Sequence, residues 1–317
     1  MNQAPRITIV APVFNEVENI DSFLDELVPV LEGMGKPFEI LAVDDGSTDG
    51  SYDKLMAYHK KDKRVKVIRF RGNFGQTAAF SAGFNFARGE TIVTMDADLQ
   101  NDPADIPALV DKLEKEGHDI VAGWRYERKD KFLSRRLPSI IANKIISKTT
   151  SMELHDYGCS LKAFHKDVIK NIKLYGEMHR FIPAIASWMG VSVAEMKVNH
   201  RPRTAGMSKY GINRTVRVML DLLTVKFLLS YSTRPIQIFG LMGLVSGGLG
   251  FMLAVWLTVQ KFAFNMALSN RPALLLAVLL ILIGVQFISM GLLAELQART
   301  YHESQDKPIY VIKNVLD

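Results

Sequence analysis

Residues 39–50 read EILAVDDGSTDG, an apolar run that ends in two carboxylates followed by small, turn-forming residues. An apolar run of this length bounded by Asp, Gly and Ser predicts a buried strand that ends in a tight turn. The pattern returns at residues 91–100, TIVTMDADLQ, where a second apolar run ends in acidic residues. We therefore expect two strands of one sheet, each with carboxylates at its carboxyl end.

Around these two strands, short apolar runs alternate with amphipathic stretches of helical length. Such alternation predicts an α/β fold with a mostly parallel sheet that is covered by helices on both faces. In open sheets of this kind, ligands bind beyond the carboxyl ends of the strands. The expected strands are Ile7–Val10, Glu39–Val43, Val65–Phe70, Thr91–Met95, Asp119–Ala122 and Val191–Val198, and the expected helices are Val17–Met34, Ser51–Lys61, Gln76–Ala87 and Ala104–Glu116.

The turn after the first expected strand argues against a dinucleotide-binding enzyme. A dehydrogenase of this layered type would carry the pattern G-x-G-x-x-G there, so that the backbone can approach a pyrophosphate. Residues 11–16 read APVFNE instead. The α/β pattern therefore indicates another class of ligand.

Two uncharged apolar segments, residues 236–259 and 273–294, follow the mixed and charged part of the chain. Each is long enough to cross a hydrocarbon core of about 30 Å, so we expect a transmembrane helical hairpin. Glycines at positions 240, 243, 247, 248 and 250 form a small-residue stripe that suits packing within the hairpin or an oligomer interface. The expected organisation is an α/β domain at 1–210, a basic amphipathic juxtamembrane segment at 211–235, the hairpin at 236–294 and a cytoplasmic tail at 295–317.

Charge and cysteine content bear on the compartment. The net charge of +6 is compatible with nucleic acid, anionic lipid or phosphorylated substrates, but acidic strand ends argue against nucleic acid. A single cysteine, Cys159, excludes an intramolecular disulfide, which fits a reducing compartment. Basic residues flank the apolar pair, whereas the loop between them carries only Lys261 and Arg271. The positive-inside bias predicts a multi-pass protein of the inner (cytoplasmic) membrane with its α/β domain and both termini in the cytoplasm.

Acidic and amide side chains gather at the two strand ends. Asp96 and Asp98 alternate along the chain, so their carboxylates can converge, and Gln100 adds an amide oxygen. These are hard oxygen ligands, which suit Mg²⁺ or Mn²⁺ and leave coordination positions for substrate phosphates. The competing interpretation is that such residues cap helices and turns, as Asp-Gly-Ser-Thr-Asp often does.

These motifs together resemble a known family. The segments Pro12–Glu16, Asp44–Ser47 and Asp96–Gln100 are similar to those of family 2 glycosyltransferases of the GT-A fold. More narrowly, the whole chain resembles the polyprenyl-phosphate glycosyltransferases, which include dolichol-phosphate mannose synthase and the bacterial undecaprenyl-phosphate glucosyltransferases of the GtrB type. The resemblance implies a Rossmann-like catalytic domain at 1–210, followed by juxtamembrane helices and two transmembrane helices.

The resemblance also implies roles on the donor side. It places the nucleotide base and ribose near the segment after the first strand and near the second strand end, and it places the metal at Asp98 and Gln100. A segment from His200 to Tyr210 resembles one that binds the donor diphosphate. The donor-binding residues implied are Pro12, Phe14, Glu16, Asp45, Asp96, Ala97, Arg203 and Lys209.

On the acceptor side, the resemblance implies that Arg125, Arg135 and Arg136 hold the lipid phosphate. Asp156 matches the usual candidate for a general base. A phosphate monoester has its second pKa at about 6, so its oxygen is already a nucleophile near neutral pH. Asp156 therefore either acts as a base or orients the acceptor or the sugar. The catalytic residues expected are Asp156, Asp98, Arg203 and Lys209.

The expected reaction is a single displacement with inversion, from UDP-glucose to undecaprenyl phosphate. The glucose follows from resemblance alone, and GDP-mannose and modified UDP-pentoses stay open. Two other functions compete: a processive polysaccharide polymerase, which usually needs more membrane helices, and a non-catalytic membrane sensor of nucleotide-sugars. The bacterial relatives also suggest a homo-oligomer, with a tetramer as the candidate state.

Overall fold

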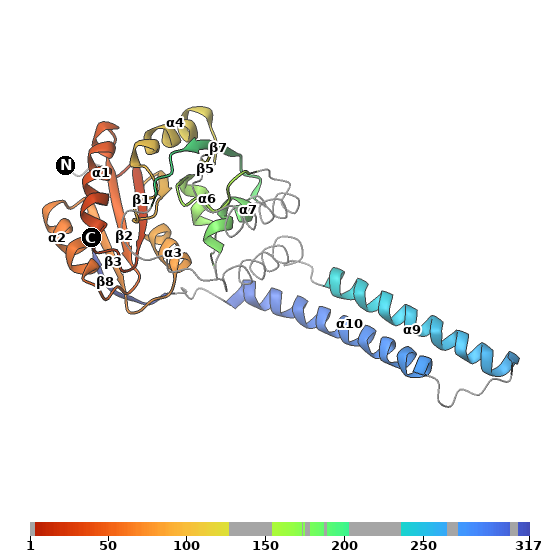
Figure 1. The fold of residues 1–317 in the computed structure, drawn as a ribbon. Helices are drawn as coiled ribbons and strands as arrows, with labels where there is room; N and C mark the ends of the chain where they lie inside the picture. Colours follow the sequence, from red (N-terminus) through yellow and green to blue (C-terminus); the bar gives the residue numbers. More distant parts are fainter. Residues whose placement is uncertain are drawn as a thin grey trace. The chain divides into compact units, whose positions relative to one another are not determined.

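The computed structural model describes residues 4–126, 154–172, 174, 178–186, 189–202, 236–264, 272–304 and 310–317. The chain divides into two compact units. One comprises Met1–Val225 together with Pro308–Asp317, and the other comprises Lys226–Lys307. The first unit is a sheet surrounded by helices, and the second contains two long helices (Figure 1).

Within the described residues, eight strands form one sheet in the order β7-β5-β6-β4-β1-β2-β3-β8 (Figure 1). The pairs β1–β2, β1–β4, β2–β3 and β5–β7 are parallel, and β4–β6, β5–β6 and β3–β8 are antiparallel. The strands are β1 (Ile7–Val13), β2 (Phe38–Asp44), β3 (Val65–Phe70), β4 (Thr91–Thr94), β5 (Ile120–Arg125), β6 (Lys162–His165), β7 (Val193–Val198) and β8 (Ile312–Leu316).

Helices cover both faces of this sheet, as the alternating pattern predicted. Successive residues of β1 point to opposite faces, so Ile9 belongs to one apolar core and Val10 to another. Leu24 of α1 lies in the first core and Phe80 of α3 in the second. The helices of this unit are α1 (Ile20–Gly33), α2 (Ser51–Lys61), α3 (Gln76–Phe86), α4 (Ile106–Glu116), α6 (Lys166–Lys170) and α7 (Ile182–Ala186), with 3-10 turns η1 (Pro103–Asp105) and η3 (Met178–Phe181).

One central strand was not expected. β6 lies antiparallel between β4 and β5, and its Ala163 is opposite Val93 on one side and Val121 on the other. The strand has only four residues, too few for an apolar alternation to stand out from the surrounding sequence. The strand is defined by its pairing with β4 and β5, which lie far away in the chain, and not by its own sequence.

The end of the chain differs from the expected separate tail. Residues 295–304 continue helix α10 (Pro272–Ser304), and β8 pairs antiparallel with the edge strand β3. The sequence did not predict β8, because the middle three of its five residues are exposed and no apolar run marks the strand. The last residues therefore belong to the sheet unit.

Helices α9 (Ile236–Phe264) and α10 pack against one another in the second unit (Figure 1). Their spans Phe239–Phe264 and Pro272–Ala294 have mean hydropathies of 1.8 and 2.7, and both are long and apolar enough to cross a membrane. Only 17% and 11% of these windows are buried inside the protein. Helices that belong to the core of a soluble protein would be mostly buried.

Small residues make the close contact between these helices. A Cβ atom on Gly243 would lie 2.7 Å from the backbone oxygen of Gly284, and one on Gly250 would lie 2.8 Å from that of Ala277. A Cβ on Gly248 would meet nothing within 4 Å. Gly243 and Gly250 therefore serve packing within the hairpin, one of the two roles that the sequence left open for the stripe, whereas Gly248 does not.

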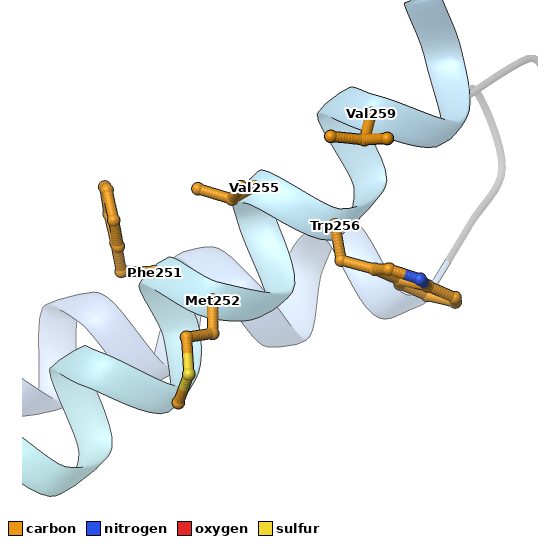
Figure 2. A pocket seen from close by; sticks show the side chains of 5 residues that line it. All are labelled: Phe251, Met252, Val255, Trp256 and Val259. Atoms are coloured by element: carbon orange, nitrogen blue, oxygen red, sulfur yellow. The ribbon is translucent and has the colours of Figure 1, made fainter. Parts of the chain in front are cut away.

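The outer side of α9 carries large apolar side chains. Figure 2 shows Phe251, Met252, Val255, Trp256 and Val259 projecting from the helix around a shallow apolar hollow. All five are between 46% and 65% exposed. A surface of this kind is stable in hydrocarbon and costly in water.

Candidate active site

The carboxyl ends of β1, β2 and β4 meet at one edge of the sheet, because these strands are parallel neighbours. Val13 is opposite Asp44 in the β1–β2 pair, and Val10 is opposite Thr94 in the β1–β4 pair. Asp45 follows β2, and Asp96 follows β4 after Met95. The two acidic clusters predicted from the sequence therefore share an edge.

Asp45 holds a loop that crosses this edge. Its Oδ1 accepts a hydrogen bond from the backbone N–H of Phe74 at 2.6 Å, and its Oδ2 accepts one from Gly75 at 2.9 Å. Burial raises the pKa of Asp45, and these two donors act in the opposite direction. Gly46, at φ +73°, packs so closely on this loop that a Cβ would lie 2.5 Å from Gly72.

The segment after β1 is tied to the same turn. Asn15, at φ 52°, donates its backbone N–H to the Ser47 hydroxyl oxygen at 2.9 Å, and its side-chain Oδ1 accepts from the N–H of Thr48 at 2.9 Å. Asn tolerates this left-handed conformation better than most residues. Glu16 donates its N–H to the Ser51 hydroxyl at 2.9 Å. Pro12, Phe14 and Glu16 thus lie on a segment that is tied to the turn containing Asp45.

The predicted metal motif after β4, Asp96–Gln100, contains two acids whose negative charges repel each other. Loss of hydration raises the pKa of Asp96, and the neighbouring charge of Asp98 raises it further. Asp98 is buried, and its Oδ1 accepts from the backbone N–H of Gln100 at 3.2 Å. Ala97 is buried between them.

Gln76 contacts this motif, and its role was not predicted from the sequence. The first residue of α3 donates its Nε2 to Asp96 Oδ1 at 2.6 Å. Its position after the Asn73–Phe74–Gly75 turn was the only local signal. The amide therefore fixes the orientation of one carboxylate of the predicted donor site.

Arg125 and Asp156 form an ion pair at the same edge. Because β6 is antiparallel to both β4 and β5, the latter two run the same way, and Arg125 ends β5 on the side of the acids. Its Nε lies 2.6 Å from Asp156 Oδ2, and its Nη2 lies 2.9 Å from Oδ1. The predicted acceptor-phosphate residue and the predicted base are thus direct partners.

Lys162, inside the sheet, supports the Asp156 loop. Its buried Nζ donates to the backbone oxygen of Tyr157 at 3.1 Å and to that of Cys159. Burial lowers the pKa of this lysine. Cys159 is completely buried, and burial raises its pKa, so the thiol is a packing group.

The segment that leads to the predicted diphosphate-binding residues begins beside the metal motif. Arg201 donates its N–H to the backbone oxygen of Gln100 at 2.9 Å, and its Nη2 lies 2.8 Å from Asp102. Arg203 and Lys209 follow but lie outside the described residues, as do Arg135 and Arg136. Their predicted roles stay predictions.

The residues present fit a divalent cation with few protein ligands. In the part of the chain that the structure describes, no three His, Cys, Asp or Glu side chains surround a metal-sized position. The Asp96–Asp98 pair nevertheless carries a repulsion that a cation would relieve. Mg²⁺ sites of this type take one or two carboxylates and complete their coordination with water and substrate phosphates.

The sheet and its helices define a GT-A fold. A crystal structure of glucosyl-3-phosphoglycerate synthase from Mycobacterium tuberculosis, in complex with Mn²⁺, UDP-glucose and phosphoglyceric acid, superposes with a TM-score of 0.56. The match covers 71% of this chain and 79% of that one at 15% sequence identity. Identity this low speaks for the fold alone, and it confirms the expected fold class.

Sequence comparison identifies the family. The model of glycosyl transferase family 2 matches residues 8–173. Dodecaprenyl-phosphate galacturonate synthase of Rhizobium johnstonii is 42% identical over 99% of this chain and 94% of its own length. Undecaprenyl-phosphate 4-deoxy-4-formamido-L-arabinose transferase of Edwardsiella ictaluri is 36% identical over 98% of this chain and 94% of its own length. This chain belongs to glycosyl transferase family 2.

Proposed function

We propose that this chain transfers a sugar from a nucleotide-sugar to a polyprenyl phosphate. The observation that carries the proposal is the shared edge of the sheet, where the Asp96–Asp98 pair and the Arg125–Asp156 pair stand beside the Asp45 turn. An acidic site suits a cation with a diphosphate, and arginines suit a phosphate acceptor. Two relatives named after polyprenyl phosphates, similar over nearly the whole chain, support this acceptor.

The donor would lie along the ends of β1, β2 and β4. In this proposal, the Asp45 turn and the segment after β1 bind the nucleotide, while Arg203 and Lys209 bind the diphosphate. Their cationic donors would stabilise charge on the departing group. The full donor set is Pro12, Phe14, Glu16, Asp45, Asp96, Ala97, Arg203 and Lys209.

Asp98 and Gln100 would hold Mg²⁺ or Mn²⁺. When bound, the cation neutralises charge on the leaving nucleoside diphosphate. The neighbouring Asp96, held by Gln76, would orient the donor sugar.

In the transfer step, an oxygen of the lipid phosphate attacks the anomeric carbon of the sugar. The bond from that carbon to the diphosphate breaks, and its electron pair leaves with the nucleoside diphosphate, which inverts the anomeric configuration. The acceptor needs no base, because a phosphate monoester is largely ionised near pH 7. Asp156 would instead orient Arg125, which binds the lipid phosphate together with Arg135 and Arg136.

The hairpin of α9 and α10 would cross the inner membrane twice and bring the active site to the lipid headgroups. The strands before the hairpin and β8 after it belong to one sheet, so both flanks of the hairpin would lie on one side of the bilayer. The basic residues that flank the hairpin favour the cytoplasmic side.

The identity of the donor sugar is the finer part of this proposal. We expected glucose, but the two relatives are named for galacturonate and for 4-deoxy-4-formamido-L-arabinose. Both names favour a uronate or a modified pentose over glucose as the first donor to test. The assay compares UDP-galacturonate, the UDP-linked formamido-pentose, UDP-glucose and GDP-mannose.

The test uses the full chain in detergent with undecaprenyl phosphate and Mn²⁺. We expect release of nucleoside diphosphate and a glycosylated lipid, identified by mass spectrometry, with one of the donors. Tight binding of a nucleotide-sugar without turnover on any polyprenyl phosphate would instead support the sensor. Native mass spectrometry of the same sample tests for a homo-oligomer, and specifically the tetramer. Gly243 and Gly250 pack inside the hairpin, whereas Gly248 lies open, so the close helix packing by itself does not argue for an oligomer.

A further inference from the structure

The segment Tyr310–Asp317 comes after both apolar helices, yet it contacts the α/β unit next to the donor side of the site. Its strand β8 pairs with β3, where Ile68 is opposite Val315 and Phe70 is opposite Ile312. The backbone oxygen of Val311 accepts from the N–H of Arg71 at 3.0 Å. The segment therefore continues past the end of β3 to the loop that follows it.

Tyr310 is the anchor of this segment. Its ring stacks on Phe70, with centroids 5.2 Å apart and planes 11° from parallel. Its hydroxyl oxygen accepts from Asn85 Nδ2 of α3 at 2.8 Å. The side chain is buried in an apolar cluster together with Ala78 and Ala82 of α3. Tyr310 thus joins the end of β3 to the helix that begins with Gln76.

The loop between these two elements, Arg71–Gly75, is the one that Asp45 holds. Phe74 packs on Phe70 in an edge-to-face arrangement, with the two ring centroids 5.8 Å apart. On its other side, the loop donates two backbone N–H groups to the Asp45 carboxylate. The contacts therefore run without a break from Tyr310 through Phe70 and Phe74 to Asp45.

We propose that Tyr310 is a positioning residue for the donor: it holds Arg71–Gly75 in place, and through that loop it orients Asp45 and the start of α3. This inference rests on the proposed function of the Asp45 turn as the nucleotide site. The loop contains Gly72 and Gly75, which have a large conformational freedom to lose. Without Tyr310, the donor would have to order the loop when it binds, and its apparent affinity would fall.

The kinetic test is made on the full chain in detergent with the variants Tyr310→Ala and Tyr310→Leu. We expect a rise of about tenfold in the donor KM, which corresponds to about 1.4 kcal/mol. The kcat and the KM for the lipid phosphate should change less than twofold. Tyr310→Phe keeps the stacked ring and loses only the hydroxyl, so it should restore most of the donor affinity.

The matched control is Asp317→Asn, at the other end of the same segment. Asp317 forms ion pairs with Lys66 and Arg88, away from the loop. This variant should weaken the strand without changing the donor KM. An equal rise in donor KM for Asp317→Asn and Tyr310→Ala would show a general effect of strand stability and overturn the proposal.

A second readout does not depend on turnover. Hydrogen exchange of the ligand-free chain should become faster at the amides of Phe74 and Gly75 in Tyr310→Leu, and stay unchanged in Asp317→Asn. Unchanged exchange at these amides would overturn the inference even if the chain is active. Faster exchange in a chain that uses no donor would keep the positioning role and refute the proposed function instead.

Discussion

Arg125 donates two hydrogen bonds to Asp156, from Nε at 2.6 Å and from Nη2 at 2.9 Å. The two side chains are only 15% and 2% exposed. At such depth, the attraction between the charges mainly offsets the cost of removing them from water. The pair therefore fixes geometry at the edge of the sheet more than it adds to stability, and it gives Arg125 one preset orientation.

Breaking this pair should destabilise the fold. Arg125→Met leaves the Asp156 carboxylate without two of its hydrogen bonds, and removing one partner of a buried pair costs about 3–5 kcal/mol. Chemical denaturation in detergent measures the loss. The double variant Arg125→Met with Asp156→Leu should lose less than the sum of the single variants. Wild-type stability for Arg125→Met would show that the pair is well solvated.

Asp98→Ala should abolish product formation and the binding of Mn²⁺, because it removes one of the two proposed metal ligands. Mn²⁺ binding is followed by electron paramagnetic resonance, which does not require an active enzyme. Asp111→Ala, on the exposed face of α4, is the control and should behave as wild type. Full activity of the wild type in excess chelator would refute the metal site.

Gln76→Ala should raise the Mn²⁺ concentration needed for half-maximal activity by tenfold or more. Its amide donates to Asp96 at 2.6 Å, and hydrogen bonds to charged groups contribute about 1.5–3 kcal/mol. The weaker binding should appear in titrations with metal and with donor, whereas the thermal midpoint of unfolding should change little. Ser81→Ala on the same helix serves as the control. An unchanged metal titration would leave Gln76 with a packing role only.

Gly284→Leu should disrupt the hairpin. A Cβ at this position would lie 2.7 Å from the backbone oxygen of Gly243 and 2.7 Å from the backbone nitrogen of Gly247, so the helices would have to separate. Overpacking of this kind costs about 1–3 kcal/mol. The thermal midpoint in detergent should fall, whereas Gly248→Leu should leave it unchanged because that position is open. Equal midpoints for the two variants would contradict the packing described for α9 and α10.

The ion pairs of Asp317 should give β8 a pH dependence. The Lys66 ammonium, followed by Arg88, lowers the pKa of this carboxyl below its usual 3.8. A lowered pKa means that the stabilisation is complete above the usual pKa and is lost as the pH falls through the lower one. With about half of the side chain exposed, the effect should stay below about 1 kcal/mol. Wild type and Asp317→Asn should differ at pH 7 and still differ near pH 4, and they should converge only as the pH falls through the lowered pKa of Asp317, which lies below 3.8. A difference that persists below this lowered pKa would have another origin.

The central strands and the acidic edge could be predicted because their signals are local. β2 is buried along its whole length, and its residues 40–43 are an apolar run that leads directly to Asp44. The turn residues that follow such a run mark its end, so Asp45 and Asp96 could be placed at strand ends before any pairing was known. Parallel pairing then puts both at one edge.

The partners of these residues could not be predicted, because they come from distant parts of the chain. Arg125 meets Asp156 across 31 positions, and Asn85 meets Tyr310 across 225. The sequence suggested that Arg125 would bind phosphate and that Asp156 would act as a base or orient a substrate, with no link between the two residues. Only the insertion of β6 between β4 and β5 brings these two side chains into contact.

By itself, the sequence determined the layered α/β domain, the apolar hairpin and the acids at the strand ends, since each follows from hydrophobic periodicity or segment length within a short window. Tertiary structure alone decided that the last strand joins β3, that Gly243 and Gly250 pack inside the hairpin, and that Gln76 holds Asp96. The physical reason is that hydrogen bonds, ring stacking and close backbone contact depend on which surfaces meet. That choice is made by the free energy of the whole fold, and no local pattern encodes it.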